Sequence, residues 1–344
     1  MKSNSRRLLR ACICLTLAIA LTAAACSYER RPDYYVAAGK LVPVSDSLNE
    51  SSVTSAAKRF RYLHDMYLAP SHMNVYVAIV PDKGYYLPDS RAELDYSALM
   101  EQTLAQMDYA APIDLTASLS ADSYYATDSH WRQECLIGTA NTVLSAMSAN
   151  AGLSGDASAN PEFSGDASAN PEFSGDALAV EDFTLATAAD CFTGSDWRAM
   201  RSKGLPMGRG FSAVLPDTLY YLDNDILRQM TVYNYDSGQT TGLYDTKKLS
   251  GSNAYDFFLS GPTAILTIDN PAAATDRQLV LLRDSYGSAL APLLAPCYRR
   301  ILMIDIRYIM SDRLPEQIDF SEWENADALY LYSTTLLNRS ISLK

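Results

Sequence analysis

Three side chains in this sequence have the types that nucleophilic catalysis requires. Asp128 and His130 lie two residues apart in the stretch "YYATDSHWRQE" (124–134), and Ser285 follows an apolar run at 279–282. A histidine can take the proton of a serine hydroxyl, and an aspartate can orient the imidazole and stabilise the imidazolium that forms. We therefore predict that Ser285 is a nucleophile, that His130 is its general base and that Asp128 orients His130.

The sequence around Ser285 favours this interpretation. The apolar run "LVLL" leads into Asp284 and Ser285, and Gly287 permits a tight turn into an apparent helix, "SALAPLLAP". Open α/β sheets bind their ligands at the carboxyl ends of the strands, where a serine in this position would lie. Free backbone N–H groups and the positive end of a helix at that point can stabilise a developing oxyanion.

The same residues also have purely structural interpretations. Asp128 or Ser129 could cap a helix over residues 131–147, because Asp and Ser are preferred at that position. Asp-Ser pairs are common in turns, and Asp284 could hold the turn instead of taking part in the chemistry. We favour catalysis because the Asp-x-His segment and the strand-end serine occur in one chain.

Trp131, Tyr286 and Arg307 are candidate contacts of the substrate. An aromatic face packs well on a sugar ring, so Trp131 could line a sugar site, and it could equally belong to the core. Arg307 follows Asp305 at the end of a predicted strand, and we favour an ion pair between the two. Lys83 also follows a predicted strand, and we expect it to be solvated.

Short apolar runs alternate with segments of helical spacing along most of the chain. Such runs are typical of strands buried on both faces, and their alternation with helices favours an α/β fold with a mostly parallel sheet covered by helices on both faces. The strands are predicted within 74–83, 111–119, 263–271, 277–287, 299–309 and 326–338, and the helices within 51–69, 96–107 and 135–147. Residues 27–50 are predicted to be an extended polar leader, and residues 51–344 one α/β domain.

The N-terminal segment differs from the rest of the chain. Basic residues precede the apolar run "ACICLTLAIALTAAA", which has the length of a signal-peptide core and is short for a membrane span. The run ends in "TAAAC", which resembles a bacterial lipobox, so we predict a lipoprotein signal over residues 1–25 with Cys26 as the lipid site. Signal cleavage near Ala25 and an uncleaved anchor are the alternatives. All three place the bulk of the chain outside the cytoplasm, and lipidation would anchor it to the outer face of the bacterial cell membrane.

A tandem repeat interrupts the predicted domain. The unit "SGDASANPEF" at 154–163 recurs without change at 164–173, and residues 174–183 keep six of its ten positions. Units this short and polar cannot form a core of their own. We therefore interpret residues 148–183 as a flexible insertion in a surface loop, with too few ligands in each unit for a known type of calcium loop.

Composition restricts the class of partner. With 344 residues and 48% hydrophobic residues, the chain can bury a sizeable core. The net charge is −12, and it becomes −16 without the four basic residues of segment 1–25. This acidity argues against nucleic acid as a partner, because nucleic acid binds basic surfaces. The three cysteines beyond Cys26 and the three histidines are dispersed, so no metal site is predicted and no disulfide is required.

The motifs resemble a known family. "TDSHW", "DSYGSALAPLLAP" and "MIDIRY", in that order, resemble the DHHW family, which is related to the SGNH-like acyltransferases of the AlgX and AlgJ type that O-acetylate alginate and other envelope polysaccharides. The resemblance runs from about residue 60 to the C-terminus, apart from the repeats. It implies an SGNH-hydrolase-like fold and gives Asp128, His130 and Ser285 the roles predicted above.

The resemblance also implies a substrate and a partner. The substrate would be a polysaccharide or an acetylated glycan, the acetyl group would arrive through a membrane O-acyltransferase, and neither metal nor organic cofactor would be needed. Asn338, after the last predicted strand, would be the oxyanion donor of an SGNH protein. The chain departs from the family at Ser129, where the family name has its first histidine, and this weakens any role of that position in substrate binding.

We therefore predict an extracytoplasmic serine O-acetyltransferase or acetylesterase that acts on a cell-envelope or secreted polysaccharide. The residues leave transfer to a sugar and hydrolysis by water as open alternatives. A non-catalytic envelope protein that binds polysaccharide or a surface partner on the same fold is the competing hypothesis. A separation between His130 and Ser285 well beyond ~6 Å would favour that binding protein. A general esterase or lipase would need a large apolar pocket.

Overall fold

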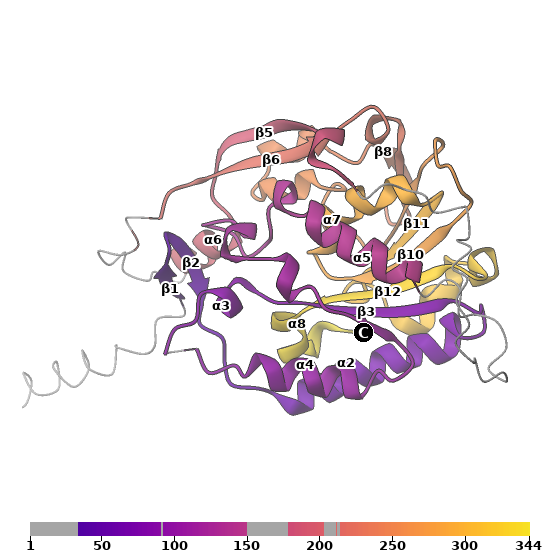
Figure 1. Ribbon diagram of the computed structural model, residues 1–344, viewed down its shortest axis with the longest axis horizontal. Helices are drawn as coiled ribbons and strands as arrows, with labels where there is room; N and C mark the ends of the chain where they lie inside the picture. Colours follow the sequence, from indigo (N-terminus) through magenta and orange to yellow (C-terminus); the bar gives the residue numbers. More distant parts are fainter. Residues whose placement is uncertain (1–33, 91, 150–177, 203–210, 212–213) are drawn as a thin grey trace, which may run out of the picture.

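A single eight-stranded sheet forms the centre of the molecule (Figure 1). The computed structural model describes residues 34–90, 92–149, 178–202, 211 and 214–344. The strand order is β4-β3-β12-β10-β11-β9-β7-β8. The strands are β3 (Asn74–Val80), β4 (Ala111–Ile113), β7 (Thr231–Asn234), β8 (Gln239–Thr241), β9 (Ile265–Asp269), β10 (Gln278–Arg283), β11 (Arg300–Ile304) and β12 (Asp327–Ser333).

The sheet is parallel at one end and antiparallel at the other. The strands from β4 to β11 in this order pair in parallel, whereas β9 pairs antiparallel with both β11 and β7, and β7 with β8. The predicted strand at 263–271 is therefore present as β9 but runs against its neighbour. The prediction of an α/β fold with a mostly parallel sheet is confirmed.

Helices cover both faces of the sheet (Figure 1). One face carries α2, α4 and α8, and the other carries α5 and α7. Two shorter helices, α3 and α6, lie near the candidate site. The bounds are α2 (Glu50–Leu63), α3 (Lys83–Tyr86), α4 (Tyr96–Ala105), α5 (Ile137–Ala149), α6 (Ser195–Ser202), α7 (Gly287–Leu294) and α8 (Thr334–Asn338).

The apolar runs are continuous because each central strand is buried on both faces. Along β10, Leu279 and Leu281 pack in the core beneath α5 and α7, whereas Val280 and Leu282 pack in the core beneath α2 and α4. Successive side chains of a strand point to opposite faces, so both sets of positions must be apolar. This pattern is that of a strand in the middle of the sheet, and Ser285 follows the carboxyl end of β10.

The N-terminal part of the described chain differs from the prediction. Residues 34–43 form a hairpin of β1 (Tyr34–Ala37) and β2 (Lys40–Pro43), joined by Ala38 and Gly39, which both have positive φ. Leu41 and Val42 are fully buried, so the prediction of a polar leader over 27–50 is wrong for this hairpin. A second two-stranded antiparallel sheet pairs β5 (Thr184–Phe192) with β6 (Asp217–Asp223), which are separated in the chain by α6.

Several predictions of the sequence fall outside the described residues. The predicted signal segment 1–25, Cys26 and both identical repeat units (154–173) belong to this group. In the described part of the chain, no helix combines the length and the apolarity that a bilayer crossing needs. Cys135, Cys191 and Cys297 are free thiols.

Truncation of a central strand residue should cost far more than truncation of an exposed one. Leu281→Ala removes a fully buried side chain of β10, and we expect the free energy of unfolding to fall by about 2–5 kcal/mol. Leu185→Ala makes the same chemical change at a position that is 55% exposed in β5, and it should cost less than about 1 kcal/mol. Urea unfolding of both variants measures the difference, and equal losses would contradict the described core.

Candidate active site

Ser285 lies in the turn between the end of β10 and the start of α7. Asp284 shapes this turn, because its Oδ1 accepts a hydrogen bond from the backbone N–H of Tyr286 at 3.0 Å and its Oδ2 accepts one from the N–H of Ser333 at 2.8 Å. The carboxylate is buried and joins the turn to the end of β12. Asp284 thus has the structural role considered for it, and it leaves the Ser285 hydroxyl to face His130.

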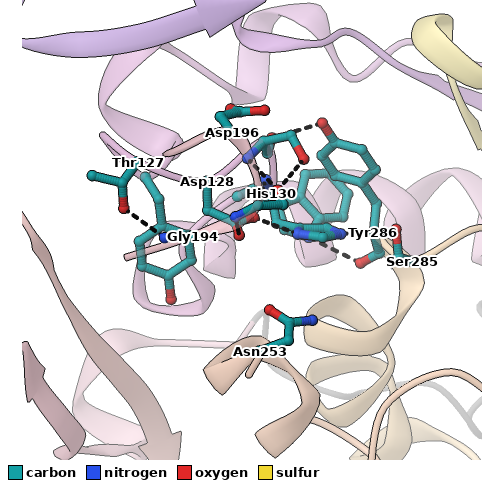
Figure 2. A network of polar contacts seen from close by, with 12 residues as sticks. Thr127, Asp128, His130, Gly194, Asp196, Asn253, Ser285 and Tyr286 are labelled. Carbon is teal, nitrogen blue, oxygen red and sulfur yellow. Dashed lines mark hydrogen bonds and ion pairs between the residues drawn. The ribbon is translucent and has the colours of Figure 1, made fainter. Parts of the chain in front are cut away.

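Asp128, His130 and Ser285 form one chain of hydrogen-bonded side chains (Figure 2). The Nδ1 of His130 lies 2.5 Å from Oδ1 of Asp128, and its Nε2 lies 2.8 Å from Oγ of Ser285. The carboxylate makes the Nδ1–H tautomer the favourable one, which leaves Nε2 free to accept the serine proton. The structure therefore brings the three predicted residues together in the order that proton transfer needs.

The Asp128 carboxylate is completely buried but has several hydrogen-bond donors. Besides the imidazole, the N–H of His130 donates to Oδ1 at 2.9 Å, and the N–H of Ser195, the first residue of α6, donates to Oδ2 at 2.6 Å. Burial by itself raises the pKa of Asp128, but the imidazole and the two N–H groups outweigh it and hold the pKa below its ordinary value. Asp128 therefore stays ionised. Its carboxylate lies at the positive, N-terminal end of α6 and does not cap the helix that follows Trp131.

A close approach of two loops makes the Ser195 contact possible. A β-carbon added to Gly194 would lie 2.1 Å from the β-carbon of Asp128, so only glycine fits there. The N–H of Gly194 donates to Oγ1 of Thr127 at 2.9 Å, and Thr127 in turn donates to Oδ2 of Asp217 at 2.5 Å. These contacts fix the loop that carries Asp128 against the start of α6 (Figure 2).

Aromatic rings hold the imidazole plane. The ring of Tyr255 stacks on His130 with centroids 3.9 Å apart and an interplanar angle of 8°. Tyr286 packs on His130 at a tilt, and its hydroxyl donates to the carbonyl of Ser129 at 2.7 Å. Trp131 is fully buried and its indole N–H donates to the carbonyl of Tyr286, so Trp131 belongs to the core and does not line a sugar site.

Two hydrogen-bond donors are candidates for binding an oxyanion at Ser285. The N–H of Ser285 has no acceptor among the residues that the structure describes, whereas the N–H of Tyr286 is already bound to Asp284. Asn253 lines the same cavity as Ser285 (Figure 2). Its Oδ1 accepts from Arg198 at 3.1 Å, which orients the amide, and its Nδ2 donates one hydrogen to Asp256 at 2.6 Å and has a second to offer.

The cavity at Ser285 has a volume of about 190 Å³. Its lining includes His130, Tyr255, Phe258, Arg283 and Arg307. Arg307 holds Asp305 with two hydrogen bonds of 2.8 and 2.6 Å, so the predicted ion pair is present and the arginine also borders the cavity.

Two residues lie elsewhere than the sequence suggested. Asn338 accepts from the N–H of Asn49 at 2.7 Å and donates to the carbonyl of Ser47 at 3.1 Å, and it lines another cavity than that of Ser285. Its amide therefore anchors the segment before α2. Lys83 is 1% exposed and ion-paired with Asp196, so the prediction of a solvated lysine is wrong.

Sequence analysis singled out neither Gly194 nor Asn253, and it did not expect the burial of Lys83. In the stretch "CFTGSDW", Gly194 directly precedes Ser195, the first residue of α6, and this glycine is the local signal for the contact. Asn253 directly precedes a 3₁₀ segment, Ala254–Phe257, and no periodic pattern in its neighbourhood distinguishes it from a surface asparagine.

Several solved structures align with most of this chain. A DHHW family protein from Eubacterium siraeum DSM 15702 aligns over 90% of this chain and 95% of its own, with 18% identity and a TM-score of 0.63. Bacillus cereus PatB1, solved with a sulfonyl adduct, aligns over 88% and 97%, with 13% identity and a TM-score of 0.62. The O-acetyltransferase domain of Pseudomonas putida AlgJ aligns over 89% and 87%, with 15% identity and a TM-score of 0.47. Comparisons with protein-family models and with curated proteins give no match.

The fold and the candidate site thus define an α/β protein with a Ser-His-Asp chain at the carboxyl end of a parallel strand. The first two likenesses show that the chain has the fold of a DHHW family protein and of PatB1 over nearly its whole length. The relation suggested by "TDSHW" and "DSYGSALAPLLAP" is therefore confirmed at the level of the fold.

The Gly194 contact predicts a specific sensitivity. Gly194→Ala forces its new methyl group into Asp128, so we expect the free energy of unfolding to fall by about 1–3 kcal/mol. Gly138→Ala is the matched control, because a methyl group there meets nothing within 4 Å on the exposed face of α5 and should stabilise the helix by about 0.5–1 kcal/mol. Denaturant unfolding distinguishes the two, and a neutral Gly194→Ala would contradict the described packing.

Proposed function

We propose that this protein is a serine-dependent acyl-transfer enzyme that moves or hydrolyses an acetyl group on a cell-envelope or secreted polysaccharide. The observation that carries the proposal is the continuous chain from Asp128 through His130 to Ser285, with contacts of 2.5 and 2.8 Å. A nucleophile, its base and the orienting carboxylate within hydrogen-bond reach are the arrangement that activates a serine.

The first half of the reaction acylates the serine. Nε2 of His130 takes the hydroxyl proton as Oγ of Ser285 attacks the acetyl carbonyl, and the resulting oxyanion accepts hydrogen bonds from the N–H of Ser285 and from Asn253. The C–O bond to the leaving alcohol then breaks, and the imidazolium returns its proton to that alcohol. Asp128 stabilises the imidazolium and does not itself take the proton.

The second half regenerates the enzyme. An acceptor hydroxyl gives its proton to Nε2 of His130 and attacks the acetyl-serine carbonyl, and collapse of the second tetrahedral intermediate returns the proton to Ser285. A sugar hydroxyl as acceptor gives transfer and water gives hydrolysis, and the outcome depends on how well the bound glycan excludes water. No metal or organic cofactor takes part in either half.

The cavity supports a short acyl group. Its volume of about 190 Å³ is below the roughly 300–1,000 Å³ of pockets that enclose drug-sized ligands. Tyr255 and Phe258 give it apolar walls, whereas Asn253, Arg283 and Arg307 give it polar ones. An acetyl group suits this space better than a long acyl chain, which argues against a general lipase.

The geometry also favours an enzyme over a binding protein on the same fold. A separation of His130 and Ser285 well beyond ~6 Å would support the binding protein. The observed distance of 2.8 Å between His130 and Ser285 supports catalysis instead. The buried, ionised Asp128 supports it too, because burying a charge lowers stability and a binding protein would not need that charge.

We propose that the enzyme acts outside the cytoplasm. The basic and apolar segment 1–25 and the "TAAAC" sequence before Cys26 support export and lipid anchoring at the outer face of the membrane. A membrane O-acyltransferase is the partner that would supply acetyl groups there. Loss of membrane association in Cys26→Ala, measured by fractionation with mass analysis of the N-terminus, tests the anchor.

An activated serine should react with a fluorophosphonate probe. We expect the probe to modify Ser285, and Ser285→Ala and His130→Ala to abolish labelling and to lower turnover of an acetyl ester by about three to six orders of magnitude. Peptide mapping of the labelled protein identifies the modified serine. Ser55→Ala, an exposed serine of α2, is the control. A folded protein that labels nowhere, or a Ser285→Ala variant with normal turnover, would contradict the proposed function.

The oxyanion assignment has its own test. Removal of one oxyanion donor typically costs about 10²–10³ in kcat, so we expect that loss from Asn253→Ala. Asn338→Ala removes the residue that the family resemblance would assign, and we expect it to lack this effect because Asn338 anchors the segment before α2. The reverse ranking in kcat measurements on one acetyl ester would overturn the assignment.

A further inference from the structure

A buried ion pair lies directly behind the predicted catalytic aspartate. The ammonium of Lys83 lies 2.8 Å from Oδ2 of Asp196 and forms an ion pair with it. Lys83 also donates to the carbonyl of Asp128 at 2.8 Å and to that of Tyr125 at 3.4 Å. Lys83 and Asp196 are 1% and 5% exposed, so both charges are almost completely removed from water.

The pair joins three segments that are far apart in the sequence. Lys83 is the first residue of α3, just after β3, and Asp196 is the second residue of α6. Residue 195, directly before Asp196, supplies the N–H that binds Oδ2 of Asp128. Lys83 thus holds the backbone of Asp128, and Asp196 belongs to the helix end that binds its side chain.

Stability alone does not explain this pair. Burial of two charges costs solvation that their attraction repays only with good geometry, and an apolar pair of similar volume is often as stable. Here the cost is visible, because burial raises the pKa of Asp196 despite the nearby ammonium, and the carboxylate of Asp128 adds to that rise. The ammonium of Lys83 thus pairs with the Asp196 carboxylate and binds the backbone carbonyl of Asp128.

We propose that Lys83 and Asp196 are positioning residues for the reaction, which hold Asp128 against the start of α6 so that His130 keeps its orientation toward Ser285. The inference rests on the proposed function. It adds a fixed order of contacts, from Lys83 to Asp196, through the Ser195 N–H to Asp128, and on to His130. A displacement of a reacting group by about 1 Å can cost about 10²-fold in rate, so loss of the pair would act on catalysis without any contact to substrate.

The test separates positioning from folding by a double substitution. Lys83→Met and Asp196→Asn each leave one buried group without its partner, so each single variant should lose thermal stability. The double variant K83M/D196N removes both charges and should regain much of that stability. If the pair positions Asp128, kcat of the double variant for an acetyl ester stays about 10- to 100-fold below that of the unmodified protein, with KM little changed. The reason is that the hydrogen bond from Lys83 to the Asp128 carbonyl is still missing.

A proton NMR signal gives a second measurement that needs no turnover. The proton shared between Nδ1 of His130 and Asp128 should resonate far downfield in the unmodified protein, and it should broaden or shift in K83M and in the double variant. Lys40→Met is the matched control, since Lys40 is a buried lysine that donates to the carbonyl of Tyr124 in the same segment at 2.8 Å but does not contact Asp128. We expect Lys40→Met to leave both the signal and kcat close to their original values.

The outcomes are distinct. Recovery of kcat and of the downfield signal together with stability in the double variant would mean a purely structural pair and would overturn the inference. Equal losses of kcat and signal in Lys40→Met and Lys83→Met would also overturn it, since any anchor of the segment would then suffice. An unmodified protein that neither labels at Ser285 nor turns over an acetyl ester would contradict the proposed function alone, because the NMR comparison would still report on Asp128 and His130.

Discussion

A buried carboxylate that must stay ionised is the constraint on which the candidate site depends. Asp128 has no solvent exposure, and desolvation alone would favour its neutral form. The charge is kept because the imidazole of His130, its backbone N–H and the N–H of Ser195 all donate to the carboxylate. The segments 127–130 and 193–196 must therefore stay in contact. Gly194 permits their close approach, and the Lys83–Asp196 pair joins them.

The parallel part of the sheet makes this convergence possible. β3 and β10 both pair with β12, in the same direction, so their carboxyl ends meet at one edge. Lys83 follows the first of these ends and Ser285 the second, while Asp284 binds the end of β12 between them. Ligands of open α/β sheets bind at such an edge because several strand ends can contribute side chains to one point. The antiparallel strands β9, β7 and β8 extend the sheet on the far side of β11.

Features with a local signal in the sequence could be predicted. The central strands appear in the sequence as continuous apolar runs. The Asp-x-His spacing and the serine after a strand indicated that His130 and Ser285 pair, and Nε2 and Oγ of these residues lie 2.8 Å apart. Contacts between distant segments left no such signal. Lys83 binds Asp128 across 45 residues and Ser195 binds it across 67, so neither the burial of the lysine nor the need for Gly194 could be inferred from their neighbours. Trp131 was ambiguous because an aromatic residue in a loop suits a core and a sugar site equally.

The proposed mechanism requires a covalent acetyl group at Ser285. The direct measurement is to mix the protein with p-nitrophenyl acetate, quench the reaction within the first turnovers and map the peptides by mass spectrometry. The account predicts the mass of one acetyl group on the peptide that contains Ser285, absent from Ser285→Ala and accompanied by a burst of the phenol product. Release of the phenol without any acetylated serine, or acetylation at another residue, would contradict it.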